Sequence, residues 1–92
     1  MSAASAGAES LPAQLLELLA GVAPDVDPAT VRHDVAFRDQ FDFDSMDLLN
    51  FATAIHDRFG IDVPERDYRH LAGVDTCVAY LRQRMPAPGA PA

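Results

Sequence analysis

The sequence predicts an all-α fold, a four-helix bundle made of three main helices plus one short helix, and three observations support it. Apolar residues recur at helical spacing in three separate segments, each flanked by residues that cap or break helices. The one β-like run, residues 60–63, is short and is followed by Pro64, so strand signals are poor. The chain has 92 residues, which suffices for one domain with a modest core.

The first helix is expected to begin after Ser10, which can cap it, with Pro12 tolerated in the first turn. Gly21 and Pro24 mark its end. The helix is amphipathic, with an apolar stripe that consists of Leu11, Leu15, Leu18 and Val22, widened by Leu16 and Leu19. This stripe is predicted to face the core.

A long loop is predicted next, over residues 23–43. Its prolines, Pro24 and Pro28, and its scattered aspartates favour irregular structure. Apolar residues spaced along the loop can anchor it to the core, namely Val31, Val35, Phe37 and Phe41. Because loops of this length are uncommon in small domains without a function, this one is a candidate for part of a site.

The second helix is predicted over residues 45–59. Asp44 is a plausible N-cap, and Asp47 lies three residues later, the spacing of a capping box. Gly60 is a good C-terminal stop. The apolar stripe of this helix is expected to consist of Leu48, Ala52, Ile55 and Phe59, with Leu49 beside it.

Two further helices complete the fold. Pro64 and Glu65 can start a short helix that continues to Leu71. Asp75 can cap a last helix, whose apolar face carries Val78, Leu81 and Met85. We expect one folded domain, residues 10–85, between a disordered N-terminal segment, residues 1–9, and a disordered tail rich in Pro and Ala, residues 86–92.

Composition and charge restrict the class of function. The formal net charge is −7, so phosphate backbones and anionic lipid surfaces would repel the chain. We therefore expect no nucleic-acid partner, and basic protein surfaces as the natural partners. The N-terminal ten residues have neither a basic start nor an apolar run, and no stretch approaches the roughly 20 apolar residues that span a bilayer. These features predict a cytoplasmic monomer without membrane insertion.

The cysteine and histidines do not suggest a metal site. One cysteine excludes an intramolecular disulfide, and the three histidines are isolated, without metal-ligand spacing. Cys77 is expected to be a small core residue. No metal ion is predicted.

The chemistry of the chain is expected at Ser45, at the start of the second helix and directly after the acidic loop. The first backbone N–H groups of a helix are unpaired and the dipole is positive there, so a phosphodiester on the serine oxygen would be stabilised. Serine is also a common capping residue, so local chemistry alone leaves open that Ser45 merely caps the helix.

The surroundings of Ser45 resemble a known family. Asp44-Ser45-Met46 is similar to the Asp-Ser-Leu motif of acyl carrier proteins, in which the serine receives 4′-phosphopantetheine. The resemblance extends over roughly residues 11–81, and the residues in register with the family pattern are Phe37, Phe41, Asp44, Ser45, Met46, Asp47, Phe59, Gly60, Ile61, Pro64 and the segment 74–81. It implies an acyl-carrier-like bundle.

The resemblance also implies a function. A phosphopantetheinyl transferase would move the arm from coenzyme A to Ser45, and Asp44 would help to position the metal-bound cofactor. The chain would catalyse nothing itself, and would hold acyl intermediates as thioesters for fatty-acid, lipid or polyketide biosynthesis. An acyl chain would be sheltered between the second and third helices by Leu49, Ile55 and Val63, although these residues could equally be plain core.

Partner binding is where the chain departs from the family. Many members carry a row of glutamates on the second helix for docking onto acyl-transferring and acyl-modifying enzymes, whereas this chain has Asn50, His56 and Arg58. Docking is therefore expected at the acidic helix start, at Asp42, Phe43, Met46 and Asp47. The alternative is that this acidic loop is simply hydrated surface.

Two alternatives to an acyl carrier are considered. Peptidyl or aminoacyl carrier domains typically have Gly-Gly before the motif, where this chain has Phe41-Asp42, which favours an acyl carrier. The other alternative is a helical interaction adaptor that keeps the fold without modification. The intact Asp44-Ser45 pair is evidence against it.

Overall fold

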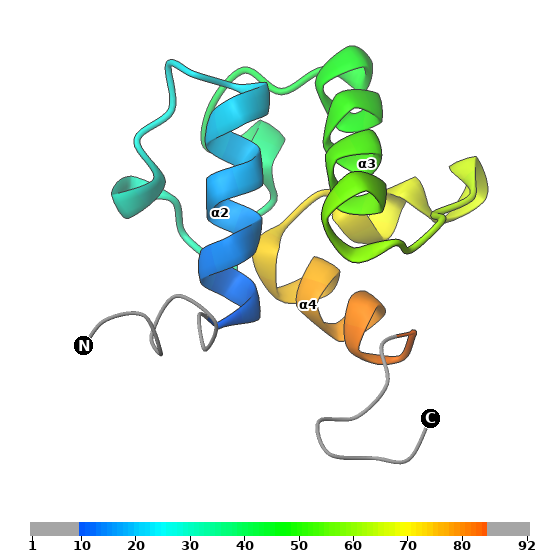
Figure 1. The fold of residues 1–92 in the computed structure, drawn as a ribbon. Helices are drawn as coiled ribbons and strands as arrows, with labels where there is room; N and C mark the ends of the chain where they lie inside the picture. The colour runs from blue at the N-terminus through cyan, green and yellow to red at the C-terminus, as the bar shows by residue number, and fades with distance from the viewer. Residues whose placement is uncertain (1–9, 85–92) are drawn as a thin grey trace.

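The structure, a computed structural model, describes residues 10–84, which form helices and connecting segments without strands. The α-helices are α2 (Leu11–Val22), α3 (Ser45–Phe59) and α4 (Val74–Arg82). The 3₁₀ helices are η1 (Pro28–Thr30), η2 (Phe37–Asp39) and η3 (Glu65–Leu71). In Figure 1, α2 and α3 stand side by side and α4 lies at their lower end. The predicted all-α class is confirmed, whereas the predicted disordered ends and Met85 lie outside the described residues.

Helix α2 begins as the sequence predicts. The Ser10 hydroxyl accepts a hydrogen bond from the Ala13 N–H at 3.3 Å, and Pro12 lies in the first turn. Leu15 and Leu19 are fully buried. Gly21 lies inside the helix, which ends one residue later, and the N–H of Ala23 closes the last turn onto the Leu19 carbonyl.

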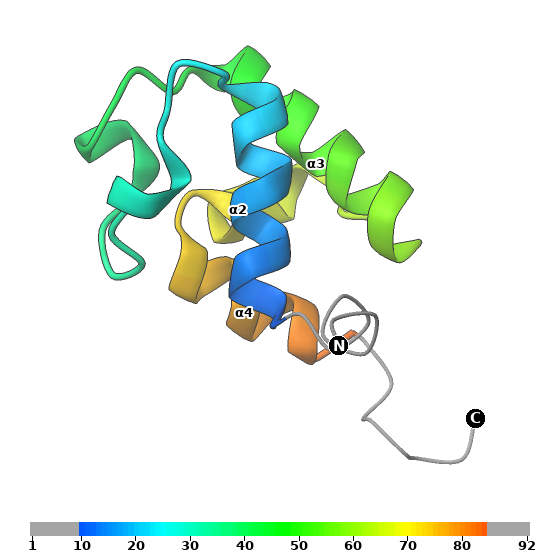
Figure 2. The same ribbon diagram turned by 60° about the vertical axis from the view of Figure 1, so that its left-hand side comes forward.

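The loop between α2 and α3 is held against the rest of the bundle by backbone hydrogen bonds. The Phe37 N–H donates to the Ala72 carbonyl at 2.7 Å, and the Asp75 N–H donates to the His33 carbonyl at 3.0 Å. Figure 2 shows the loop on one side of α2, with α3 on the other. The loop is therefore fixed to the segment that joins η3 to α4.

Gln40 organises the interior of this loop. Its side-chain oxygen accepts from the Arg32 N–H at 2.7 Å, and its amide nitrogen donates to the carbonyls of Arg32 and Val35, both at 2.8 Å. One side chain thus satisfies three backbone groups that have no helical partner, which is how an irregular segment avoids leaving polar groups unpaired.

Four phenylalanines join the loop to α3. Phe37 is buried and its ring centroid lies 5.7 Å from that of Phe41, 5.2 Å from that of Phe43 and 5.8 Å from that of Phe51. Most of these pairs are edge-to-face, the arrangement that aromatic quadrupoles favour. Two of the predicted anchors, Phe37 and Phe41, are thereby confirmed as packing residues.

Helix α3 contains one core residue that the sequence analysis missed. Phe51 is fully buried, although the predicted stripe omitted it. Leu49, placed beside the stripe, is instead 42% exposed. Phe51 is three residues after Leu48 and four before Ile55, so it belongs on the same face of the helix as the predicted stripe. The predicted stop is confirmed, since Gly60 ends the helix with a φ of 71°.

The start of α4 differs from the prediction. Its N-cap is Gly73, not Asp75, which lies in the first turn. The Asp75 N–H is bound by the His33 carbonyl, and Gly73 approaches the Val35 carbonyl closely. The long loop therefore determines where α4 begins. The Asp75 carboxylate contributes only a favourable interaction with the positive end of the helix dipole.

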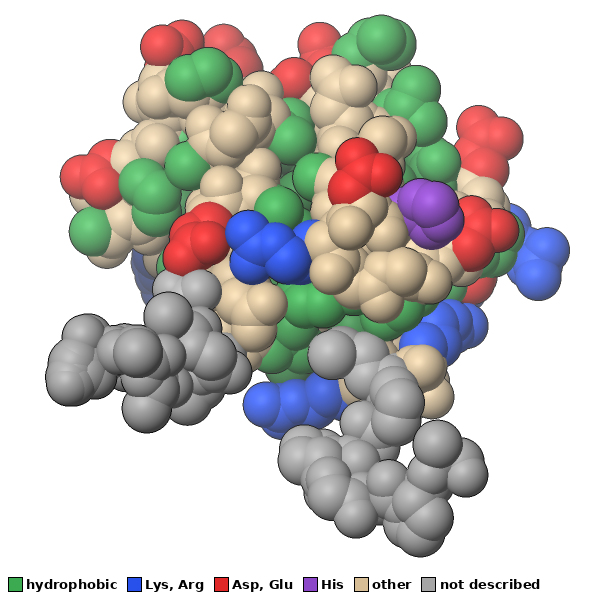
Figure 3. Space-filling view, in the orientation of Figure 1, with side chains coloured by type: hydrophobic (Ala, Val, Ile, Leu, Met, Phe, Trp, Pro, Cys, Tyr) green, Lys and Arg blue, Asp and Glu red, His purple; other side chains and the backbone are tan. Residues whose placement is uncertain are grey.

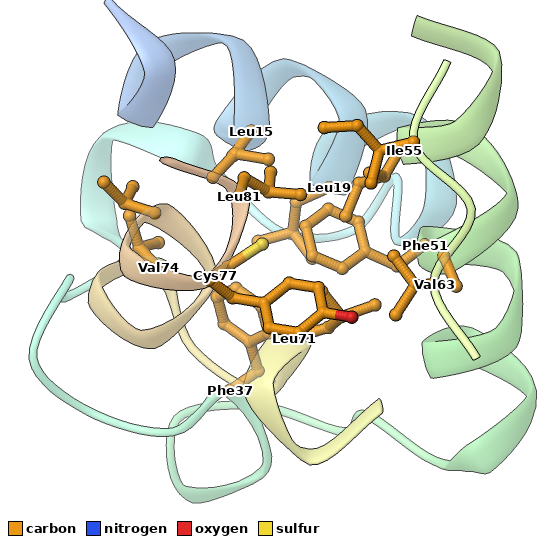
Figure 4. Packing of buried hydrophobic residues seen from close by; sticks show 14 of the residues in the cluster. Leu15, Leu19, Phe37, Phe51, Ile55, Val63, Leu71, Val74, Cys77 and Leu81 are labelled. Carbon is orange, nitrogen blue, oxygen red and sulfur yellow. The ribbon is translucent and has the colours of Figure 1, made fainter. Parts of the chain in front are cut away.

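The core is apolar throughout the described chain, with no buried charged or polar side chain. Figure 4 shows its members converging from all three α-helices: Leu15 and Leu19, Phe51 and Ile55, and Cys77 and Leu81. Burial raises the pKa of the Cys77 thiol to about 12. The only thiol of the chain is therefore a protonated core group, as expected.

Candidate functional site

Ser45 is exposed at the first residue of α3, and its hydroxyl forms no hydrogen bond with any of residues 10–84. The capping task belongs to Asp44, whose Oδ1 accepts the Asp47 N–H at 2.9 Å. The hypothesis that Ser45 merely caps the helix is therefore wrong. Its hydroxyl is available to a reaction partner.

The capping box fixes the backbone around this serine. In addition to the Asp44 contact, Asp47 Oδ2 accepts the Asp44 N–H at 3.2 Å. Each carboxylate uses one oxygen in this pair, so Asp44 Oδ2 has no hydrogen-bond partner within the described residues. The N–H groups of Ser45 and Met46 also remain unpaired there, as the first N–H groups of a helix do.

A surface cavity of about 350 Å³ adjoins Ser45. It is formed by the loop, the first turn of α3 and the end of η3, and its lining residues are Ala36, Arg38, Phe43, Asp44, Ser45, Leu48, Arg69 and Ala72. The lining combines apolar walls with charged groups. A serine hydroxyl at the edge of such a cavity can carry a group that then lies along the protein surface.

Comparison with known proteins agrees with this geometry. The sequence model of the family described as "Phosphopantetheine attachment site" matches residues 13–81, a segment that includes Ser45 and the cavity. An acyl carrier protein of Rhodococcus erythropolis is 34% identical over 79 residues, covering 86% of this chain and 81% of that protein. The chain belongs to the acyl carrier protein family.

Two other relatives show the range of similar proteins. An acyl carrier protein of Beutenbergia cavernae is 31% identical over 71 residues, covering 71% of this chain and 87% of that protein. A meromycolate extension acyl carrier protein of Mycolicibacterium smegmatis is 29% identical over 73 residues, covering 73% of this chain and 74% of that protein. As a family member, the chain is an acyl carrier that tethers acyl groups on a phosphopantetheine arm and works with a phosphopantetheinyl transferase and acyl-handling enzymes.

The residues around Ser45 fit a phosphopantetheine arm. A phosphodiester linkage needs a hydroxyl that is not engaged elsewhere, room beside it and compensation for negative charge. Ser45 provides the hydroxyl, the adjoining cavity provides the room, and Arg38 and Arg69 on its wall provide positive charge.

The residues predicted to shelter an acyl chain differ in burial, and their role stays a prediction. Ile55 is fully buried in the core and Val63 is nearly so. Leu49 is largely on the surface. The α3 leucine that faces the cavity beside Ser45 is Leu48, which the sequence analysis assigned to the core stripe.

The residues predicted to bind partners fall into two groups. Asp42 and Met46 are exposed, Met46 at 60%. Phe43 packs in the aromatic cluster and Asp47 takes part in the capping box, so both are half-buried structural residues. Figure 3 shows hydrophobic side chains and carboxylates together on the surface at the upper end of α3, where Met46 and Leu49 are the large exposed hydrophobic residues.

Of the three α3 residues that replace the family's row of glutamates, one contacts another helix. Arg58 reaches across to α2, where its guanidinium lies 3.3 Å from the Glu17 carboxylate. It therefore links two helices, whereas Asn50 and His56 are exposed. Among residues 10–84, no group of three or more His, Cys, Asp or Glu side chains is arranged to hold a metal ion, and no helix is long and apolar enough to cross a membrane.

Three residues that shape the site gave no signal in the sequence. Arg38 and Arg69 were not predicted, because nothing in sequence spacing relates them to Ser45. Gln40, which orders the loop, also gave no signal. A glutamine acquires such a role only through the path of the backbone around it.

Proposed function

We propose that Ser45 is the residue that bears the phosphopantetheine arm, through a phosphodiester bond on its Oγ. The observation that carries this proposal is the exposed Ser45 hydroxyl, left free because Asp44 takes over the capping hydrogen bond. When bound, the arm supplies the thiol on which acyl groups are held as thioesters. The chain has no thiol of its own for this task, since Cys77 is buried and protonated.

The residues around Ser45 prepare it for modification. The capping box sets the backbone of the first turn, so the hydroxyl is presented in one place instead of many. The unpaired N–H groups of Ser45 and Met46 stabilise negative charge on the attached phosphate. Asp44 Oδ2 is free to bind the divalent cation that accompanies coenzyme A in the transferase reaction.

Partner enzymes are proposed to dock at the α3 end that begins at Ser45. Exposed Met46 and Leu49 supply apolar contact, and Asp42 and Asp47 supply negative charge. With a net charge of −7, the carrier favours enzymes with basic docking surfaces. The chain is proposed to act as a cytoplasmic monomer that catalyses no reaction and binds no nucleic acid.

The cargo is proposed to be a fatty acyl chain, in fatty-acid or related lipid biosynthesis. The relatives of the chain include acyl carriers for meromycolate extension. Before the motif, the chain has Phe41-Asp42 in place of the Gly-Gly pair of aminoacyl carriers. Shelter of such a chain between Leu49, Ile55 and Val63 would require α3 to separate from the segment 60–64, because Ile55 has no exposed surface.

The test is transfer of the arm to purified protein. The chain is incubated with coenzyme A, Mg²⁺ and a phosphopantetheinyl transferase of broad specificity, and its intact mass is measured. Wild type should gain one phosphopantetheine mass and Ser45→Ala none. Ser10→Ala is the matched control, since it also removes an exposed helix-start hydroxyl, and it should still be modified. Modification of Ser45→Ala would place the attachment at another residue.

A further inference from the structure

Two arginines beside Ser45 have no carboxylate partner. The chain carries seven arginines and no lysine, against 14 acidic residues. Arg32, Arg58 and Arg84 each lie within 4.0 Å of a carboxylate. Arg38 and Arg69 form no side-chain hydrogen bond or ion pair with any of residues 10–84, and both line the cavity beside Ser45.

Their common location is a product of the fold. Arg38 lies in η2 and Arg69 in η3, two short helices far apart in the sequence. The hydrogen bond from the Phe37 N–H to the Ala72 carbonyl, at 2.7 Å, joins these two segments directly beside the arginines. The backbone segments that carry the two arginines are therefore fixed relative to each other, and both arginines line one cavity.

Arg38 has no ion pair although several carboxylates are near it in the sequence. Asp39 follows Arg38 directly, and Asp42 and Asp44 are near in sequence, yet none lies within ion-pair distance of Arg38. A cavity with two free guanidinium groups in an acidic protein has the charge to hold an anion. Guanidinium groups bind phosphate oxygens through two parallel N–H donors, the strongest geometry available to a side chain.

We propose that Arg38 and Arg69 bind the phosphodiester of the phosphopantetheine arm and hold the base of the arm in this cavity. The inference rests on the proposed attachment at Ser45. A phosphate on Ser45 Oγ is tethered beside the arginines, so its effective concentration there is high without any association step. Apolar side chains of Phe43 and Leu48 complete the wall against which the arm lies.

The cavity has room for more than the phosphate. A second cavity, of about 280 Å³, shares Ala36, Arg69 and Ala72 with the first and continues toward Thr76. The two cavities therefore adjoin, and the arm has room in both when no enzyme is bound.

The experiment compares unmodified and arm-bearing protein by nuclear magnetic resonance. Backbone amide and arginine Nε–H shifts are recorded before and after modification, together with ³¹P relaxation of the arm. The variants are Arg38→Gln, Arg69→Gln and both together. Arg82→Gln is the matched control, because Arg82 is an exposed arginine on α4 that does not line this cavity.

In wild type, the arm should shift the Nε–H signals of Arg38 and Arg69 and the amides of η2 and η3. In the double variant these amide shifts should fall by about twofold or more and the phosphorus should become more mobile, whereas Arg82→Gln should match wild type. High salt should reproduce the effect in the wild-type protein, because it screens the charges. This salt series tests the proposal even if a variant fails to fold.

The possible failures are distinguishable. No gain of mass in wild type would overturn the attachment at Ser45. A gain of mass with equal shifts and equal ³¹P relaxation in wild type and double variant would leave attachment intact and overturn the role of the arginines. Arginine variants that only slow modification by the transferase would also overturn phosphate binding by these residues. That result would assign both arginines to recognition of the transferase.

Discussion

At the scale of single residues, the division of labour between Asp44 and Ser45 is what makes the site usable. A helix start needs side-chain acceptors for its first N–H groups. Asp44 and Asp47 supply them reciprocally, so the serine between them is not required for stability. A group can then be attached to its oxygen without loss of the cap.

This arrangement predicts different effects for two changes of Asp44. Asp44→Ala should lower the free energy of unfolding by about 1 kcal/mol, because it removes the cap. Asp44→Asn should stay within about 0.5 kcal/mol of wild type, because the amide oxygen can still accept the Asp47 N–H. Urea unfolding measures both values.

The rate of arm transfer, followed by intact mass, distinguishes the capping role of Asp44 from the role of its negative charge. If Asp44 binds the cation of the transferase reaction, Asp44→Asn should be modified more slowly despite its stability. An Asp44→Asn protein that is as unstable as Asp44→Ala would show that the carboxylate charge, and not the hydrogen bond, stabilises this helix start.

At the scale of elements, the long loop behaves as a structured component. It contains only two turns of 3₁₀ helix, η1 and η2, yet it buries Val31 and Phe37 and carries one wall of the cavity. The aromatic cluster fixes the end of the loop next to Ser45, and the hydrogen bonds of Gln40 fix its middle. Its order therefore depends on a few side chains.

Gln40 provides the test of this element. Gln40→Ala removes three hydrogen bonds to backbone groups, and should lower the free energy of unfolding by roughly 1–3 kcal/mol. Amide exchange at Arg32 should accelerate, since its N–H loses the Gln40 oxygen. Both quantities are accessible from urea unfolding and hydrogen exchange.

Gln40→Glu serves as the comparison for this change. It keeps an acceptor for the Arg32 N–H but cannot donate to the carbonyls of Arg32 and Val35. Exchange at Arg32 should then remain closer to wild type while stability still falls. Unchanged stability in Gln40→Ala would mean that the phenylalanine cluster alone orders the loop.

At the scale of the whole molecule, the buried residue Tyr80 joins η3 to α4 through polar contacts. The Tyr80 hydroxyl donates to Asp67 at 2.7 Å, and the Arg84 guanidinium lies 3.7 Å above the Tyr80 ring while also pairing with Asp67. The His70 ring stacks on Tyr80 at 5.1 Å. The hydrogen bond from Tyr80 is the main reason why the pKa of Asp67 is lower than usual.

This contact predicts a pH dependence of global stability. Because the pKa of Asp67 is lowered by folding, its contribution is present above the unfolded value of about 3.9 and is lost as the pH falls through the folded value. Tyr80→Phe removes the hydrogen bond, so it should be less stable than wild type at neutral pH. The difference between the two proteins should shrink as the pH falls below the unfolded pKa of about 3.9.

Tyr68→Phe is the control for the loss of a tyrosine hydroxyl. Tyr68 is half-buried, whereas Tyr80 is buried, and the Tyr68 hydroxyl makes no hydrogen bond with residues 10–84. In thermal or urea unfolding across the acid range, the stability of Tyr68→Phe should change with pH in the same way as that of wild type. A Tyr80→Phe difference in stability that does not change anywhere in the acid range would exclude Asp67 as its source.

Local signals in the sequence determined the helices and the position of Ser45. Ser10, the Asp44–Asp47 box and Gly60 act on backbone groups within a few residues, so their roles could be read from spacing and are confirmed. The family resemblance, which rested on the motif at Ser45 and on residues in register over roughly 11–81, is confirmed as well. The attachment at Ser45 itself stays a prediction.

Tertiary structure alone decided the features that depend on residues far apart in the chain. The cap at Gly73, the hydrogen bonds of Gln40 and the meeting of Arg38 with Arg69 all follow from how the loop returns to the segment between η3 and α4. Periodicity carries no information about that return. Its geometry is set by hydrogen bonds and packing between segments, and only the folded chain brings those groups together.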